Sequence, residues 1–207
     1  MLSSPAEPWV LTAPESYLLR HADRGADAVE AFGLALKELV AREALCLEAV
    51  AIVRRLGLGA RRAWLLARGP ELAAVTEPSL AAVLAVYERR ARAAGVLLDD
   101  LRRVAGRESR RYLRRDVAGS LQRRGLLTGD GARTAAGRRA NEELDAWLEL
   151  GLLRLPLWAS DQLDPSRALA YVQGAGSAIL LIQDGYPALD AAFAGGHADV
   201  VGDLTVA

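Results

Sequence analysis

The stretch GLALKELVAREALCLEA, residues 33–49, joins a helical pattern to a strand pattern within one short segment. From Ala28 to about Arg42, apolar side chains recur at the spacing of one helix face. That face holds Val29, Phe32, Leu36, Leu39 and Val40, while Glu30, Lys37 and Glu38 point elsewhere. ALCLEAVAIV at 44–53 then predicts a strand, and RRAWLLAR at 61–68 predicts its hairpin partner. We therefore expect an amphipathic helix that leads directly into a small hairpin.

Further helices are indicated by capping and stop signals along the chain. Thr12, Pro14 and Glu15 form a capping-box pattern, in which the serine- or threonine-type cap and the glutamate satisfy each other's backbone amides. This predicts a helix over PESYLLRHAD. The other expected helices cover 78 to the Gly95 stop, a short segment from Asp99, 109–124, 134–151, 164–183 and a last short one in YPALDAAFA.

The predicted fold class is mainly α, a compact multi-helix domain with one or two small β-hairpin or wing excursions. An amphipathic helix is twice followed by a small β element, in ALKELVAREALCLE and in SLQRRGLLTGDG. We expect a single domain over 1–207, with sub-units at 12–70 and 77–195 and a frayed tail at 196–207. The same pattern leaves open tandem winged-helix units.

Charge is distributed unevenly along a chain that is neutral as a whole. The 207 residues are 52% apolar and 25% charged, which is the balance of a globular protein. Residues 102–139 hold twelve arginines and three acids, whereas residues 140–207 hold two arginines and ten acids. The basic segment therefore forms an anion-binding surface, or it packs against the acidic segment and is neutralised there.

The residue patterns that are typical of several functional classes are absent from this sequence. Cys46 is the single cysteine, and His21 and His197 are the only histidines, outside any nucleophile or metal-ligand pattern. The glycine pairs in GLGARR and GAGSA lack the further residues of a phosphate-binding loop. The longest uncharged run of the C-terminal part, 168–183, is shorter than the roughly 20 residues of a membrane-spanning helix. We expect a non-catalytic cytoplasmic protein without metal or cofactor.

The candidate binding residues are Arg107, Arg111, Arg114 and Arg115. On a helical wheel these four fall on one side of the 109–124 region, while Leu113 and Val117 fall on the other. Guanidinium groups bind phosphate oxygens in a bidentate manner. The stripe is thus suited to an anionic lipid surface, to nucleic acid, or to the acidic last third of its own chain.

Four segments resemble the Golgi phosphoprotein 3 family. The matching residues of the opening stretch are Gly33, Leu36, Glu38, Leu39, Arg42, Leu45, Leu47 and Glu48. LTAPESYLLRHADRG is similar to the family's opening helix, RYLRRDVAGSLQRRGLLT to its arginine-rich helix, and LDPSRALAYVQGAGSAILLIQD to a late helix. The order matches over about three quarters of the chain. The chain departs from the family at two positions: no tryptophan lies near Ala28, and Glu43 stands where the family has a glycine.

The resemblance implies a mostly helical, non-catalytic protein that holds a phosphoinositide head group, with Arg111 and Arg114 on the family's R-x-x-R pair. Peripheral attachment to a membrane from the cytoplasm follows from it. Two other partners stay open. One is nucleic acid bound by a winged-helix module, which a neutral chain disfavours; the other is an unidentified protein.

Overall fold

The computed structural model describes residues 9–53, 60–159 and 165–182. Helix α1, Ala13–His21, begins where the capping box predicts, and the backbone amide of Thr12 donates to Glu15 Oε2 at 3.1 Å. Its other end is held by Arg133, whose guanidinium donates two hydrogen bonds of 2.7 Å to carbonyls of the last turn. Both ends of this short helix are therefore satisfied by side chains.

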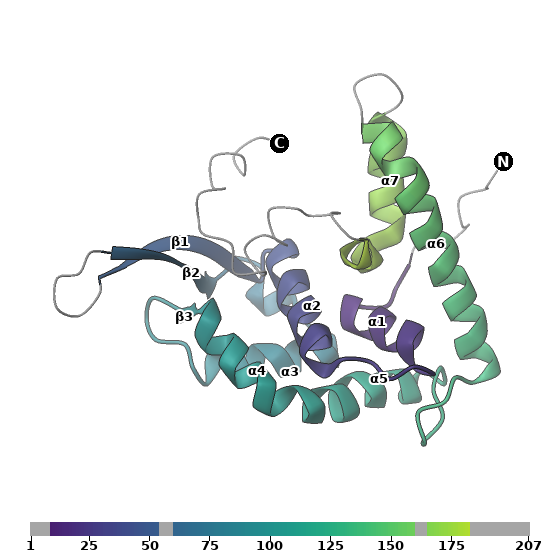
Figure 1. Cartoon of the computed structure of the whole chain (residues 1–207), viewed down its shortest axis with the longest axis horizontal. Helices are drawn as coiled ribbons and strands as arrows, with labels where there is room; N and C mark the ends of the chain where they lie inside the picture. The colour runs from purple at the N-terminus through teal and green to yellow at the C-terminus, as the bar shows by residue number, and fades with distance from the viewer. Residues whose placement is uncertain (1–8, 54–59, 160–164, 183–207) are drawn as a thin grey trace.

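The opening stretch folds as its pattern predicts. Helix α2, Ala28–Ala41, starts at Asp27, which accepts hydrogen bonds from the amides of Val29 and Glu30. Strand β1, Leu45–Val53, follows after a tight turn and pairs antiparallel with β2, Ala60–Arg68. The hairpin extends away from the helical body (Figure 1). The predicted helix-to-strand transition and the predicted hairpin are confirmed.

Two side chains of α2 lie opposite to their predicted positions. Val29 was expected in the apolar stripe, but it is 52% exposed and lines a surface hollow beside the next long helix. Glu38 was expected on the polar face, but it is only 1% exposed. Glu38 can be buried because it accepts a hydrogen bond from the backbone amide of Ala13 and pairs with Arg42.

A third strand completes the sheet. Strand β3, Val96–Leu97, pairs antiparallel with β2 at Leu65 and Leu66, which gives the strand order β1-β2-β3. Sequence patterns miss β3 because two residues are too few to show alternation. Before it lie a 3₁₀ turn, η1 at Leu72–Ala74, and helix α3, Pro78–Glu88, which ends before the predicted stop at Gly95.

The arginine-rich region is one helical run rather than the two helices expected from the sequence. Helix α4, Leu98–Tyr112, continues through a π-helical segment η2, Leu113–Val117, into α5, Ala118–Arg123. Gly106 does not break the run, although glycine costs about 1 kcal/mol in a helix interior. Burial of apolar residues on both sides of Gly106 outweighs that cost.

The C-terminal part forms a helical hairpin. Helix α6, Ala135–Ala159, and helix α7, Pro165–Ala175, lie side by side, and the 3₁₀ segment η3, Gly176–Leu181, returns the chain to α1 (Figure 1). The second wing expected from SLQRRGLLTGDG, residues 120–131, is reduced to one bridge between Leu127 and Arg133. The Asp164 cap, the helix in 186–194 and the tail at 196–207 lie outside the described residues.

A single cluster of buried side chains runs through the described residues, from Trp9 to Ile182. Trp147, Tyr87 and Phe32 are the bulkiest of its fully buried members. All seven α-helices, α1 to α7, and the sheet contribute to this core. The predicted fold class, mainly α with a small β excursion, is confirmed.

Candidate anion-binding surface

The predicted arginine stripe lies on the outside of the α4–η2 run. Leu101, Val104, Ala105, Tyr112 and Val117 face the core, whereas Arg107, Arg111, Arg114 and Arg115 are exposed. Tyr112 fixes the run against α2, where its ring meets Phe32 edge-on with centroids 5.5 Å apart. The helix period thus separates a buried apolar face from an exposed basic one.

Three of the four predicted arginines line one hollow between α3 and α4, which we call the α3–α4 hollow. It has a volume of about 640 Å³. One wall comes from α3, namely Ala82, Ala85, Val86 and Arg89, and the other from the α4–η2 run, namely Arg107, Glu108, Arg111, Tyr112, Arg115 and Asp116. Four guanidinium groups and two carboxylates give it a net positive charge.

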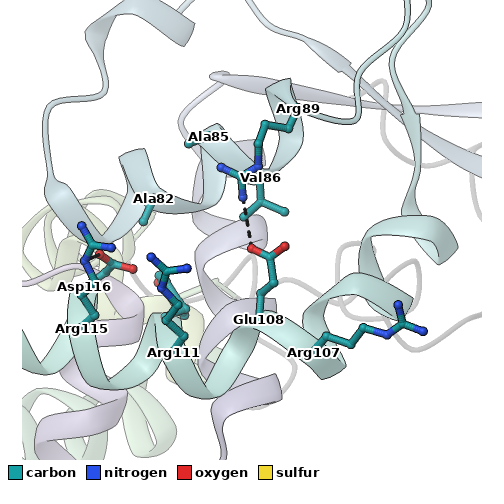
Figure 2. A pocket seen from close by; sticks show the side chains of 10 residues that line it. Ala82, Ala85, Val86, Arg89, Arg107, Glu108, Arg111, Arg115 and Asp116 are labelled. Carbon is teal, nitrogen blue, oxygen red and sulfur yellow. Dashed lines mark hydrogen bonds and ion pairs between the residues drawn. The ribbon is translucent and has the colours of Figure 1, made fainter.

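The side chains of this hollow are only partly paired with each other. Arg89 bonds Glu108 across the hollow at 3.1 Å, and Arg115 lies 3.9 Å from Asp116 (Figure 2). Arg107 and Arg111 form no ion pair with any described residue. Exposed ion pairs contribute about 0–1 kcal/mol, so an incoming phosphate can replace them at little cost.

Arg114 lies apart from the other three. It lines a second hollow, the α2–α4 hollow, together with Arg110 and the first residues of α2. The R-x-x-R pair is therefore divided between two surfaces, with Arg111 in one hollow and Arg114 in the other. The π-helical turn that begins at Leu113 gives the residues after it a different angular register from that of a plain α-helix.

Arg89 and Arg110 belong to this surface but were not among the predicted residues. Arg110 is exposed beside Arg114, and its position on the helical wheel would have revealed it. Arg89 ends α3 and comes from outside the basic segment. No local signal marks Arg89, because its place in the hollow depends on how α3 packs against α4.

The acidic last third does not neutralise these arginines within the described residues. Its acids in that part are Glu142, Glu143, Asp145 and Glu149, all on α6. Asp145 pairs instead with Arg20 at 3.1 Å. None of the four forms an ion pair with Arg107, Arg111, Arg114 or Arg115. The other six acids of that third lie outside the described residues.

A second charged cluster surrounds the buried Glu38, and its other charged members, Arg42 and Glu77, are half-buried. Arg42 bonds Glu38 at 2.6 Å and Glu77 at 2.5 Å, and Ser177 also donates to Glu38, so the cluster joins α2, α3 and η3. Burial raises the pKa of Glu38 despite the opposing effects of Ser177 and Arg42. Burial is also the largest single effect on Glu77 and acts to raise its pKa, but the hydrogen bond from Arg42, the backbone hydrogen bonds and the charge of Arg42 together outweigh it, so the pKa of Glu77 is lowered.

The remaining chemical candidates are not gathered into a site. Within the described residues, no group of three or more His, Cys, Asp or Glu side chains is arranged to hold a metal ion. His21 stacks on Tyr17 with ring centroids 4.6 Å apart, and burial lowers the pKa of its imidazole. Cys46 is half-buried on β1. His197 lies outside the described residues.

No protein-family model, curated protein or solved structure matches this chain. The resemblance to the Golgi phosphoprotein 3 family therefore depends on the four quoted segments alone. Among the described residues, no helix has both the length and the apolar character needed to cross a membrane.

Proposed function

We propose that this protein is a non-catalytic binding protein that attaches to anionic membrane surfaces by holding a phosphorylated head group in the α3–α4 hollow. The observation that supports it most is the pair Arg107 and Arg111, both exposed and without an ion pair to any described residue. Unpaired guanidinium groups in a concave surface need no rearrangement before they meet phosphate oxygens. The resemblance to a phosphoinositide-binding family points to the same class of ligand, although it pairs Arg111 with Arg114, which lines a different hollow.

The expected affinity is modest. Each arginine near an anionic leaflet contributes about 1 kcal/mol, so the four arginines of the hollow would together contribute roughly 4 kcal/mol. Such an attachment is reversible, weakens as salt concentration rises, and needs a second contact for stable anchoring.

Nucleic acid is the weaker alternative for the same arginines. A nucleic-acid backbone presents an unbroken row of phosphates, and Glu108 and Asp116 would repel it within the hollow. The chain is also neutral overall, whereas nucleic-acid-binding domains are usually strongly basic. A compact head group reduces this repulsion, because it carries few phosphates and can place them beside guanidinium groups rather than beside the carboxylates.

The proposal is tested by sedimentation of the protein with three kinds of vesicle: phosphatidylcholine alone, phosphatidylcholine with phosphatidylserine, and phosphatidylcholine with a phosphoinositide. We expect no sedimentation with the first and the most with the third, decreasing as salt rises. Equal sedimentation with all three would refute the proposal. A gel shift on random duplex DNA in the same buffers tests the alternative, and a strong salt-sensitive shift without vesicle binding would favour it.

A further inference from the structure

Another basic hollow, distinct from the α2–α4 hollow, adjoins the α3–α4 hollow along α4. We call it the α4–β3 hollow; its volume is about 650 Å³. Its basic residues are Arg90 and Arg92 from the turn after α3, and Arg103 and Arg107 from α4, and its acidic residues are Asp100 and Glu108. It has the same count of guanidinium groups and carboxylates as its neighbour.

The turn that carries Arg90 and Arg92 is held firmly in place. Backbone hydrogen bonds join Arg92 and Gly95 in both directions, at 3.0 and 3.3 Å. Gly95 has φ of +114°, and a Cβ at this position would overlap the carbonyl oxygen of Leu66 on β2. Only glycine permits this close approach, so the sheet fixes the turn and with it the origin of the two arginine side chains.

Three guanidinium groups of the α4–β3 hollow have no ion pair within the part of the chain that the structure describes. Arg103 is bonded to Asp100 at 2.6 Å, one turn away on the same helix. Arg90, Arg92 and Arg107 form no ion pair with any described residue. The α4–β3 hollow therefore adds Arg90 and Arg92 to the phosphate-binding groups of the α3–α4 hollow and shares Arg107 with it.

The two hollows share a wall. Arg107 and Glu108 line both of them. Figure 2 shows Glu108 between Arg111 and Arg107, with the guanidinium of Arg107 on the far side of Glu108 from Arg111. The carboxylate of Glu108, which is bonded to Arg89, therefore lies between two groups of arginines. Phosphate is thus favoured on either side of Glu108 and disfavoured beside it.

We propose that the two hollows form one two-lobed site, which binds a ring carrying at least two phosphate groups and takes one phosphate in each hollow. This inference rests on the proposed function only in taking the ligand to be the head group of a membrane lipid. From Arg107 to Arg111 the helix rises about 6 Å, and the guanidinium of Arg107 is turned away from Arg111, on the far side of Glu108 (Figure 2). Phosphates on opposite sides of one ring are suited to that span.

The test is calorimetric titration with soluble inositol monophosphate and inositol 1,4-bisphosphate. The variants are Arg111→Ala in the α3–α4 hollow and Arg92→Ala in the α4–β3 hollow. Arg139→Ala is a control that removes the same charge from the exposed surface of α6. We expect the bisphosphate to bind more tightly than the monophosphate. Arg111→Ala and Arg92→Ala should each weaken bisphosphate binding about tenfold, and the control less than twofold.

Equal affinity for the two ligands, or unchanged bisphosphate binding by Arg92→Ala, would overturn the two-lobed site. Vesicle sedimentation of the same variants separates this result from failure of the proposed function. If vesicles bind but Arg92→Ala has no effect on bisphosphate, only the two-lobed site fails. If bisphosphate binds through both hollows but vesicles do not, the site holds and the ligand is a free polyphosphate. Absence of any phosphate binding overturns both.

Discussion

Arg111 and Arg114, three residues apart on one helical run, line different hollows of the protein surface. In the α2–α4 hollow Arg114 shares its surroundings with the carboxylate of Asp27, whereas Arg111 faces the basic α3–α4 hollow. The two positions of the R-x-x-R pair should therefore not be equivalent in binding.

We predict that Arg111→Ala weakens binding to phosphoinositide vesicles about tenfold, because it removes a charge-assisted hydrogen bond to phosphate. Arg114→Ala should weaken the same binding less than threefold, since only the long-range charge is lost. Sedimentation of the two variants side by side measures the difference. Equal losses would mean that the head group contacts both arginines and that their placement in different hollows does not affect binding.

Glu108 should oppose ligand binding, because its carboxylate occupies Arg89 and stands between two groups of arginines. Replacement by glutamine keeps the size of the side chain and removes its charge. We predict that Glu108→Gln tightens binding of inositol 1,4-bisphosphate about fivefold, equivalent to roughly 1 kcal/mol. Titration calorimetry at constant salt provides the measurement, and weaker binding by this variant would show that Glu108 helps to position Arg89.

Glu38 gives the stability of the fold a specific dependence on pH. Burial holds the pKa of its carboxyl above the ordinary value of 4.5, so the folded chain binds this proton more tightly than the unfolded chain. The contribution of Glu38 to the free energy of unfolding is therefore complete below pH 4.5 and falls as pH rises through the raised pKa.

We accordingly predict that Glu38→Gln, whose side chain does not titrate, gains stability relative to the wild type as pH increases from 4.5 to neutrality. Urea unfolding of both proteins at several pH values gives the difference in free energy of unfolding. Carboxyl groups that contact neither Glu38 nor its partner Arg42 cancel in this comparison. A difference that stays constant or moves in the opposite direction would contradict the assigned pKa shift.

Gly151 permits the close packing of α6 on α7. A Cβ at this position would overlap the Tyr171 hydroxyl, which donates a 2.7 Å hydrogen bond to the carbonyl of Trp147. We predict that Gly151→Ala lowers the free energy of unfolding by about 1–3 kcal/mol through overpacking. Vesicle binding by the folded variant should stay at the wild-type level, because Gly151 lines neither basic hollow. Thermal unfolding and sedimentation measure the two effects separately.

Local patterns were sufficient for the elements whose determinants lie close together in the sequence. The Thr12–Glu15 capping pattern, the periodicity of α2 and the β1–β2 hairpin all depend on neighbours within a few residues, and each is present in the structure. The same reasoning failed for Glu38, because its partners Ala13 and Ser177 come from distant segments. A buried carboxylate with distant partners has the local sequence signature of a surface residue.

The candidate site was partly predictable for the same reason. Helical periodicity indicates that Arg107, Arg111, Arg114 and Arg115 lie on the outer face of a helix, and the structure exposes all four. Helical periodicity gives no information on which other elements pack beside these arginines. Arg89, Arg90 and Arg92, which come from the end of α3 and the turn after it, were therefore not expected near the arginines of α4. The division of Arg111 from Arg114 also escaped prediction, because a π-helical turn has no distinct sequence pattern.

In the proposed function the α3–α4 hollow, and not the positive charge of the protein in general, binds the head group. The double variant Arg107→Ala/Arg111→Ala removes the two arginines of the hollow that have no ion pair within the described part of the chain. Arg24→Ala/Arg139→Ala removes the same charge from two exposed positions outside the hollow.

Sedimentation of both double variants with phosphoinositide vesicles at one salt concentration is the most direct test. The hollow predicts a loss of about a hundredfold for Arg107→Ala/Arg111→Ala and only a few-fold loss for Arg24→Ala/Arg139→Ala. Equal losses in the two variants would contradict the claim and would leave non-specific attraction between arginines and the anionic surface as the cause of binding.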